Sequence, residues 1–287
     1  MTDLKRLQLN STRQFILVIV LLFQISSLNA QKRFSFVFLP DLHLQPDKEV
    51  IADFEELASH LNRLRPDFVL TGGDMIYTAK NVDDKKAEVL FDLMDKELKL
   101  LKMPVYMTMG NHENVGITAE SGIDKSNPNW GKQMFEKRYH PRFYSFNFNG
   151  WKFFVLDGIK ILEREKNYTS GIDSLQIEWI KQELSSTGPE MPLVISVHTP
   201  FINPHAMTRS GLDALSEASA NVLSLFKDHN LKMVLQGHNH TYMNLYINGI
   251  HYISGGSSSF GTNLHNDGFL HIKIKKDTEK IEFIKGN

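Results

Sequence analysis

Short apolar runs alternate along the chain with longer segments in which apolar residues recur every three or four positions. The runs at 34–40, 67–71 and 105–109 are typical of buried strands. The segments that start at Asp47 and that cover roughly 82–101 have helical spacing, and Asp47 stands where it can cap the first helix. Strands that alternate with helices in this way indicate βαβ units and a parallel sheet.

The second half of the chain mixes hairpins with further strands and helices. Residues 143–157 predict a hairpin with Asn149-Gly150 as its two-residue turn. A helix is expected to start at Asp173, and Gln176 has the spacing of a capping box. This helix is expected to cover 173–184. The other expected elements are a helix near 215–228, strands over 192–197, 231–236, 241–247 and 250–254, and a terminal pair of strands around 268–285. This order predicts an α/β fold, a four-layer α/β/β/α sandwich of two mixed sheets flanked by helices.

The first thirty residues differ from the rest and are typical of a secretory signal peptide. Basic residues precede the apolar run at 15–23, and small residues lead up to Ala30. The run is shorter than the roughly 20 residues that a transmembrane helix needs. We expect a cleaved signal peptide at 1–30, a single domain at 31–287, no membrane span after cleavage, and a periplasmic or secreted location. An uncleaved anchor and a buried helix stay open as alternatives.

The composition narrows the chemistry of any site. The formal net charge is −1, so no basic footprint indicates nucleic-acid binding. The chain contains no Cys, which excludes disulfides and thiolate metal sites. Any metal ion must therefore be held by oxygen and imidazole nitrogen. No sequence feature marks an interface with a partner protein.

Polar side chains with metal-binding character stand immediately after the predicted strands. They are Asp41, His43, Asp74, Asn111, His112, His198, His238 and His240. Functional groups gather where parallel strands end at their carboxyl edge. Asp, Asn and neutral imidazole suit hard and borderline divalent metals, and the set is too large for one tetrahedral zinc. It fits two metals about 3.5–4 Å apart that share a carboxylate, an arrangement known for phosphoester hydrolysis.

These residues form five short blocks in a fixed order. The blocks are DLH at 41–43, GGD at 72–74, GNHE at 110–113, VH at 197–198 and GHNH at 237–240. In content and order they resemble the blocks of the calcineurin-like metallophosphoesterases, and the resemblance spans about 34–240. It implies a metal-dependent phosphoric ester hydrolase, in which a hydroxide that bridges two metal ions attacks phosphorus.

The resemblance also implies a role for each residue. Asp41, His43 and His240 would hold the first metal, Asn111, His198 and His238 would hold the second, and Asp74 would bridge them. His112 and Asp74 would be the catalytic residues, with His112 stabilising the transition state or protonating the leaving oxygen. The two ions would be Mn, Fe, Zn or a mixture.

One feature departs from this pattern. Asp74 and Tyr77 match the Gly-Asp-x-x-Tyr block of purple acid phosphatases, in which the tyrosine binds ferric iron. Those enzymes typically lack the histidine of the first block, which is present here as His43. Tyr77 is therefore either an iron ligand or a residue that packs beside the metal site.

Other residues carry weaker signals. His140, Arg142, His205 and Arg209 lie in loops that would overhang the site. Glu113 is expected beside the ligands rather than among them. Trp130 and Phe201 would contact an organic group of the substrate or pack within their own loops. Asn167 begins a glycosylation acceptor pattern, which matters only in a eukaryotic source.

The sequence thus predicts an exported binuclear phosphoesterase that acts on a small phosphoester such as a nucleotide or a lipid headgroup. The DLH block resembles that of cyclic-nucleotide and other phosphodiesterases, which favours a phosphodiester. A phosphomonoesterase or acid phosphatase, or an enzyme similar to serine/threonine protein phosphatases, would use the same metal set and is the alternative. The rival from another class is a binding module that keeps the fold without catalysis.

Overall fold

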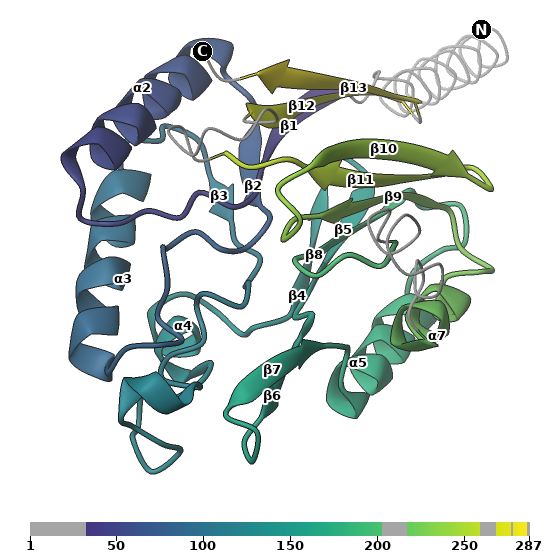
Figure 1. Cartoon of the computed structure of the whole chain (residues 1–287). Coiled ribbons are helices and arrows are strands. Elements are labelled where there is room, and N and C mark those ends of the chain that lie inside the picture. Colours follow the sequence, from purple (N-terminus) through teal and green to yellow (C-terminus); the bar gives the residue numbers. More distant parts are fainter. Residues whose placement is uncertain (1–32, 203–216, 259–267, 277, 286–287) are drawn as a thin grey trace, which may run out of the picture.

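The computed structural model describes residues 33–202, 217–258, 268–276 and 278–285. These residues form two mixed sheets that pack face to face, with helices on the outer face of each sheet (Figure 1). The expected four-layer α/β sandwich is therefore confirmed. The expected signal peptide lies outside the described residues, as do His205 and Arg209.

The first sheet has the strand order β13-β12-β1-β2-β3. Its strands are β1 (Arg33–Leu39), β2 (Phe68–Thr71), β3 (Val105–Tyr106), β12 (Gly268–Lys275) and β13 (Thr278–Lys285). β1, β2 and β3 run parallel, whereas β12 and β13 pair antiparallel. Helices α2 (Lys48–Leu64) and α3 (Asp84–Leu98) cover its outer face. Asp47 caps α2 as expected, because its side chain accepts from the N–H groups of Glu49 and Val50.

The second sheet has the strand order β10-β11-β9-β8-β5-β4. Its strands are β4 (Tyr144–Phe148), β5 (Trp151–Leu156), β8 (Leu193–Val197), β9 (Leu231–Gln236), β10 (Tyr242–Ile247) and β11 (Ile250–Gly255). The inner four strands run parallel, and β4 and β10 form antiparallel edges. The expected Asn149-Gly150 turn is confirmed, with positive φ at both residues. Helices α5 (Ser174–Ser185) and α7 (Glu217–Leu225) cover the outer face.

An aromatic core joins the two sheets. Phe36 of β1 and Phe68 of β2 stack at 5.0 Å, and Phe153 of β5 meets their edges at 5.5 and 5.4 Å. All three side chains are fully buried. The alternate residues Val37 and Val69 point instead to the layer under α2 and α3. Because close-packed aromatic layers resist displacement, this core fixes the carboxyl ends of the two sheets relative to each other.

The structure differs from the sequence-based expectation in the connecting segments. Strand β3 ends after two residues, because the N–H of Thr108 donates to the side chain of Thr71 instead of continuing the ladder. The segment expected to be irregular contains a 3₁₀ turn (Ala119–Ser121) and helix α4 (Gln133–Arg138), and a hairpin not expected from the sequence forms from β6 (Ile159–Leu162) and β7 (Asn167–Ser170).

The capping box at α5 is only half formed. Asp173 accepts a hydrogen bond from the Gln176 N–H, as expected for an N-cap. The Gln176 side chain does not reach back to the cap. It is buried and bonds to both backbone groups of Asp157, at 3.0 and 2.9 Å. Gln176 therefore ties α5 to the end of β5.

None of the helices in the described part of the chain is long and apolar enough to span a membrane.

Candidate metal centre

Loops from the carboxyl ends of five strands meet in one seam between the sheets. They follow β1, β2 and β3 in the first sheet and β8 and β9 in the second. Hydrogen bonds that cross the seam include one in which His198 Nδ1 donates to the Gly72 carbonyl at 2.8 Å and one in which the His238 N–H donates to Asp41 Oδ2 at 3.0 Å. The polar residues that end different strands in the sequence are thus held together in space.

Five of the seven candidate ligands adopt a left-handed backbone conformation. Asp41, His43, Asp74, His238 and His240 have φ values between 48° and 71°. Each such non-glycine residue costs on the order of 1 kcal/mol, and the conformation persists only where neighbouring contacts enforce it. Asp and His tolerate this region better than most residues. The strain is concentrated where strand-end side chains must turn into the seam, which is typical of a functional site.

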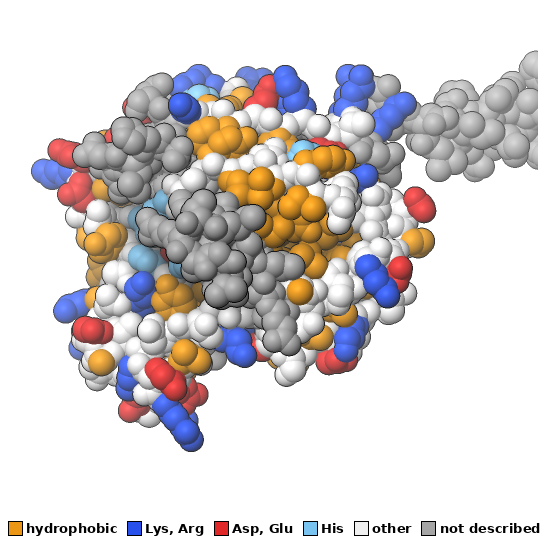
Figure 2. All heavy atoms as spheres, turned by 45° about the vertical axis from the view of Figure 1, so that its right-hand side comes forward, with side chains coloured by type: hydrophobic (Ala, Val, Ile, Leu, Met, Phe, Trp, Pro, Cys, Tyr) orange, Lys and Arg blue, Asp and Glu red, His pale blue; other side chains and the backbone are white. Residues whose placement is uncertain are grey.

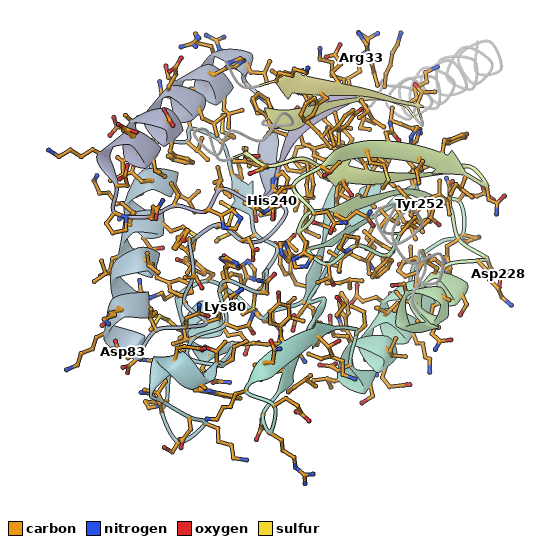
Figure 3. All side chains as sticks on the ribbon, viewed as in Figure 1. Arg33, Lys80, Asp83, Asp228, His240 and Tyr252 are labelled. Atoms are coloured by element: carbon orange, nitrogen blue, oxygen red, sulfur yellow. The ribbon has the colours of Figure 1, made fainter. Side chains whose placement is uncertain are left out.

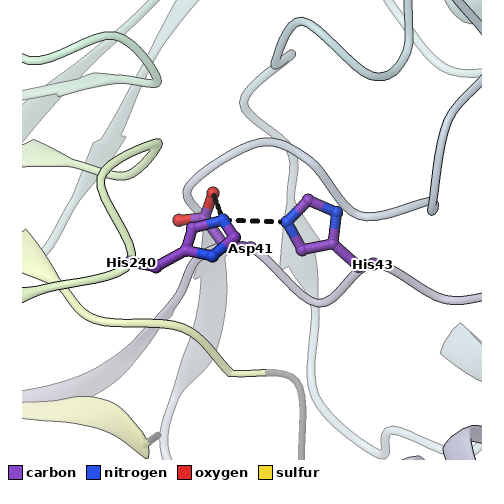
Figure 4. A group of neighbouring side chains, drawn as sticks. All are labelled: Asp41, His43 and His240. Atoms are coloured by element: carbon purple, nitrogen blue, oxygen red, sulfur yellow. Dashed lines mark hydrogen bonds and ion pairs between the residues drawn. The ribbon is translucent and has the colours of Figure 1, made fainter. Parts of the chain in front are cut away.

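Asp41, His43 and His240 form the first group of candidate ligands (Figure 4). The Nε2 atoms of the two histidines lie 3.0 Å apart, and His240 Nε2 lies 3.4 Å from Asp41 Oδ1. All three ligand atoms lie within 4.8 Å of one another. This spacing suits side chains that share one ion, because each bond from a ligand to a transition metal is about 2.0–2.2 Å long.

Asn111, His198 and His238 form the second group. Asn111 Oδ1 lies 3.0 Å from His198 Nε2 and 3.0 Å from His238 Nδ1, and the two nitrogens are 3.3 Å apart. Asp74 Oδ2 lies 3.2 Å from His198 Nε2, and the Asp74 carboxylate also falls within 4.8 Å of the ligand atoms of His43 and His112. Asp74 therefore reaches both groups.

Burial and the buried carboxylates together set the protonation of the histidines. Burial lowers the pKa of His198, but the charges of Asp74 and Asp41 outweigh it and raise this pKa to about 10. Burial lowers the pKa of His43 to about 3. Burial and the charge of His198 lower the pKa of His238 to about 4. His43 and His238 are therefore neutral and present lone pairs, while the carboxylates favour the positively charged form of His198.

This set of donor atoms fits a pair of cations. Because His198 Nδ1 donates to the Gly72 carbonyl, its Nε2 is the atom that faces the centre. The atoms around it are Asn111 Oδ1, Asp74 Oδ2 and His238 Nδ1, all of which carry lone pairs. Acceptor atoms packed this closely in a buried seam need a positive charge between them. Nitrogen and oxygen donors of this kind suit divalent transition metals.

His112 lies at the rim of the centre. Its N–H donates to Asp74 Oδ1 at 2.8 Å, and its ring Nδ1 donates to the carbonyl of Tyr77. Its Nε2 lies 3.8 Å from Asp74 Oδ2 and 3.3 Å from Lys80 Nζ, and the ring is partly exposed. Burial lowers the pKa of His112, and the charge of Asp74 opposes this effect. Figure 2 shows histidine side chains that reach the surface together on one face, with a basic side chain beside them.

Glu113 holds the ligand-bearing loops together. Its buried carboxylate accepts from the N–H groups of Gly110, Asp74, Met75 and Ile76, at 2.7, 3.1, 2.7 and 3.3 Å. The loop after β2 is thereby tied to the loop after β3. Glu113 lies beside the ligands, in agreement with its expected place.

Other residues that the sequence placed near the site have different contacts. His140 packs on an aromatic ring, Arg142 pairs with two aspartates, Trp130 donates to a backbone carbonyl, and Phe201 lies in the core beneath α5 and α7. These contacts support the packing alternatives. The Tyr77 side chain is half exposed, and among the described residues no hydrogen bond joins its hydroxyl to a candidate ligand.

Sequence reasoning missed two residues at the rim. Lys80 Nζ lies 3.3 Å from His112 Nε2 and 5.5 Å from the ring centre of Tyr168. Neither residue directly follows a predicted strand. Tyr168 comes from the unexpected β6–β7 hairpin. The only available signal was that Lys80 lies six residues after Asp74, in the same loop.

Comparison with known proteins agrees with this geometry. A family model described as calcineurin-like phosphoesterase matches residues 34–242. Human tartrate-resistant acid phosphatase type 5 is 24% identical over 225 residues, covering 73% of this chain and 66% of that protein. A probable cyclic nucleotide phosphodiesterase of Fibrobacter succinogenes is 22% identical over 209 residues, covering 72% of this chain and 73% of that protein. The chain thus spans 66% of the length of the human acid phosphatase it matches.

Among solved structures, a dimetal phosphatase from Danio rerio superposes with a TM-score of 0.62. The two chains are 15% identical, and the match covers 87% of this chain and 95% of that one. At this identity the superposition shows the shared fold.

The close approach of Gly110 to Asp74 gives a test of the centre. A Cβ at Gly110 would lie 2.3 Å from Asp74 Oδ1 and 2.4 Å from the Asp74 backbone nitrogen, so Asp74 would have to move together with its loop. We expect Gly110→Ala to weaken metal binding by about 10- to 100-fold, as when a ligand loses its support. The affinity is measured by titration of metal-stripped protein, and circular dichroism reports the fold.

Gly188→Ala is the matched control, because a Cβ at that position meets nothing within 4 Å. Equal metal affinities for the two variants would contradict the place of Asp74 in the centre.

Proposed function

The chain belongs to the calcineurin-like phosphoesterase family, and we propose that it is an exported enzyme that hydrolyses small phosphoesters with two metal ions. The observation that supports this most is the pair of ligand groups on either side of Asp74, at a rim that solvent reaches. No partner protein is needed to complete these groups, since one chain supplies them all.

In this proposal each ligand group holds one ion. Asp41, His43 and His240 would hold the first, Asn111, His198 and His238 would hold the second, and Asp74, which reaches both groups, would be shared between them. The separations of 3.0–3.4 Å between neighbouring ligand atoms support this division. The absence of cysteine favours Mn, Fe, Zn or a mixture.

Bound ions would supply a water with a pKa lowered from about 15.7 to roughly 7, and would neutralise charge on the phosphoryl oxygens. The chain's own groups orient the reaction. His112 donates through Nδ1 to the Tyr77 carbonyl, which aims Nε2 at the open side of the centre. Once protonated, His112 would donate from there to a phosphoryl oxygen or to the leaving oxygen. Burial and the nearby Lys80 lower the pKa of His112, and the charge of the adjacent Asp74 opposes this lowering.

The substrate is a small phosphoester such as a nucleotide or a lipid headgroup. The DLH block favours a phosphodiester, and the relative described as a probable cyclic nucleotide phosphodiesterase supports that choice. The tartrate-resistant acid phosphatases are relatives at similar identity and support a monoester. Both reactions use the same ligand set, so groups around the metals must distinguish them.

A purple acid phosphatase that uses Tyr77 as an iron ligand is a second candidate, supported by the acid phosphatase relatives and the Asp74–Tyr77 spacing. It requires the half-exposed Tyr77 side chain to turn toward the centre. Visible colour from tyrosinate bound to ferric iron would favour it, and a colourless active enzyme would exclude it.

Activity tests the proposed function directly. The purified protein is stripped of metal, reloaded with Mn²⁺, and assayed on p-nitrophenyl phosphate and bis-p-nitrophenyl phosphate. We expect hydrolysis that stripping abolishes. We also expect Asp74→Ala and His238→Ala to lower kcat/KM by about 10³-fold or more while the fold is kept, because each removes several kcal/mol of transition-state stabilisation.

His251→Ala serves as the matched control, because His251 lies on β11 and bonds to Asn244, away from both ligand groups. Wild-type turnover in the Asp74 or His238 variant would overturn the site assignment. Two bound metals without turnover on either ester would favour the binding module instead.

Export is tested at the amino terminus. The basic start and the apolar run at 15–23 support cleavage after Ala30. We expect protein recovered from the periplasm or medium to begin at Gln31, as read by intact-mass spectrometry. A mature protein that keeps residues 1–30, or that stays inside the cell, would contradict export.

A further inference from the structure

Lys80 has a fixed position at the rim of the metal centre. Its carbonyl accepts from the N–H and the hydroxyl of Thr118, at 3.1 and 3.2 Å. The adjacent Ala79 bonds through its N–H to the His112 carbonyl at 2.8 Å and through its carbonyl to the Gly116 N–H at 3.0 Å. These bonds join the Lys80 backbone to the loop that carries His112. The fold therefore sets the distance between the two residues.

The Lys80 ammonium group lies on the reactive side of the centre. Lys80, labelled in Figure 3, lies in the loop before α3, and its ammonium lies over the Tyr168 ring of β7. Its Nζ is 3.3 Å from His112 Nε2, the atom from which we propose that His112 donates. Within the described part of the chain, no carboxylate pairs with this Nζ at 4 Å or less. Its charge is therefore available to an anionic ligand.

Tyr168 forms a wall beside this ammonium group. The Lys80 Nζ lies over the Tyr168 ring, 5.5 Å from its centre, so the aromatic face limits where the cation can move. Burial and the negative charge of Asp74 raise the pKa of Tyr168. A cation held between His112 and an aromatic ring is more ordered than an ordinary surface lysine.

We propose that Lys80 binds a phosphoryl oxygen of the substrate and selects esters whose phosphoryl group carries two negative charges. This inference rests on the proposed function and names its substrate class. A phosphomonoester is largely dianionic at neutral pH, since its second pKa is about 6, whereas a phosphodiester carries one charge. Lysine binds phosphate as a point charge, so the second charge strengthens its contact.

The role of Lys80 predicts that the substrate is a phosphomonoester, whereas the DLH block favours a phosphodiester. A diester presents a neutral ester oxygen and a second organic group in place of one charged oxygen. Beside a half-buried ammonium and an aromatic wall, that exchange weakens the attraction that Lys80 provides, because one of the two negative charges is lost.

Lys80→Met tests this role, because it keeps much of the side-chain length and removes the charge. We expect kcat/KM for p-nitrophenyl phosphate to fall by about 10- to 100-fold, the usual worth of a hydrogen bond to a charged group. For bis-p-nitrophenyl phosphate we expect a fall of less than about threefold, as for a weak contact at an exposed rim. Lys80→Arg should keep the monoester preference.

A second readout does not depend on turnover. Isothermal titration of metal-loaded protein with inorganic phosphate should show about 10-fold or weaker binding for Lys80→Met. Lys85→Met is the matched control, because Lys85 is an exposed lysine of α3 and its loss changes the net charge equally. Metal content is measured for each variant, so that a lost ion is not mistaken for a lost phosphate contact.

The two proposals fail in different ways. If wild-type protein cleaves neither ester, the proposed function fails, and the phosphate titration still decides whether Lys80 binds the anion. If Lys80→Met keeps both metals, the wild-type ratio of monoester to diester turnover and the wild-type phosphate affinity, the role of Lys80 is wrong. The phosphoesterase assignment would then stand unchanged.

Discussion

Two buried carboxylates, Asp41 and Asp74, set the condition that the rest of the seam must meet. A buried charge without a partner costs several kcal/mol, so these groups require positive charge within a few ångströms. The histidines differ in how much positive charge they supply. His43 is kept neutral by burial, whereas the carboxylates raise the pKa of His198. A pair of cations would satisfy both carboxylates and the lone pairs of the surrounding imidazoles together.

The fold makes this concentration of charge possible because it holds the carboxyl ends of the two sheets side by side at one seam. The aromatic layer around Phe68 joins the sheets, and their parallel strands end at the same seam. Glu113 then ties the loop after β2 to the loop after β3 through four backbone bonds. The strained backbone at Asp41 and His240 is tolerated because these contacts leave it little freedom. The packing of the two sheets and the bonds of Glu113 therefore hold the candidate metal ligands in their positions.

Much of this arrangement could be predicted from the sequence, because its signals are local. Apolar runs marked the strands, and a polar residue at the end of each run marked a position at the sheet edge. What could not be predicted depends on tertiary contacts. Gln176 has the spacing of a capping box, yet its side chain turns inward to the backbone of Asp157. Lys80 reaches the rim only because Thr118 and the neighbouring loop fix its backbone.

The central claim is that two metal ions lie in the seam and share Asp74. A crystal structure of the Mn²⁺-loaded protein, with anomalous data collected at the manganese edge, tests it most directly. If two ions share Asp74, we expect two peaks about 3.5–4 Å apart. One would lie beside Asp41, His43 and His240, and the other beside Asn111, His198 and His238. A single peak, or two peaks that do not share Asp74, would contradict it.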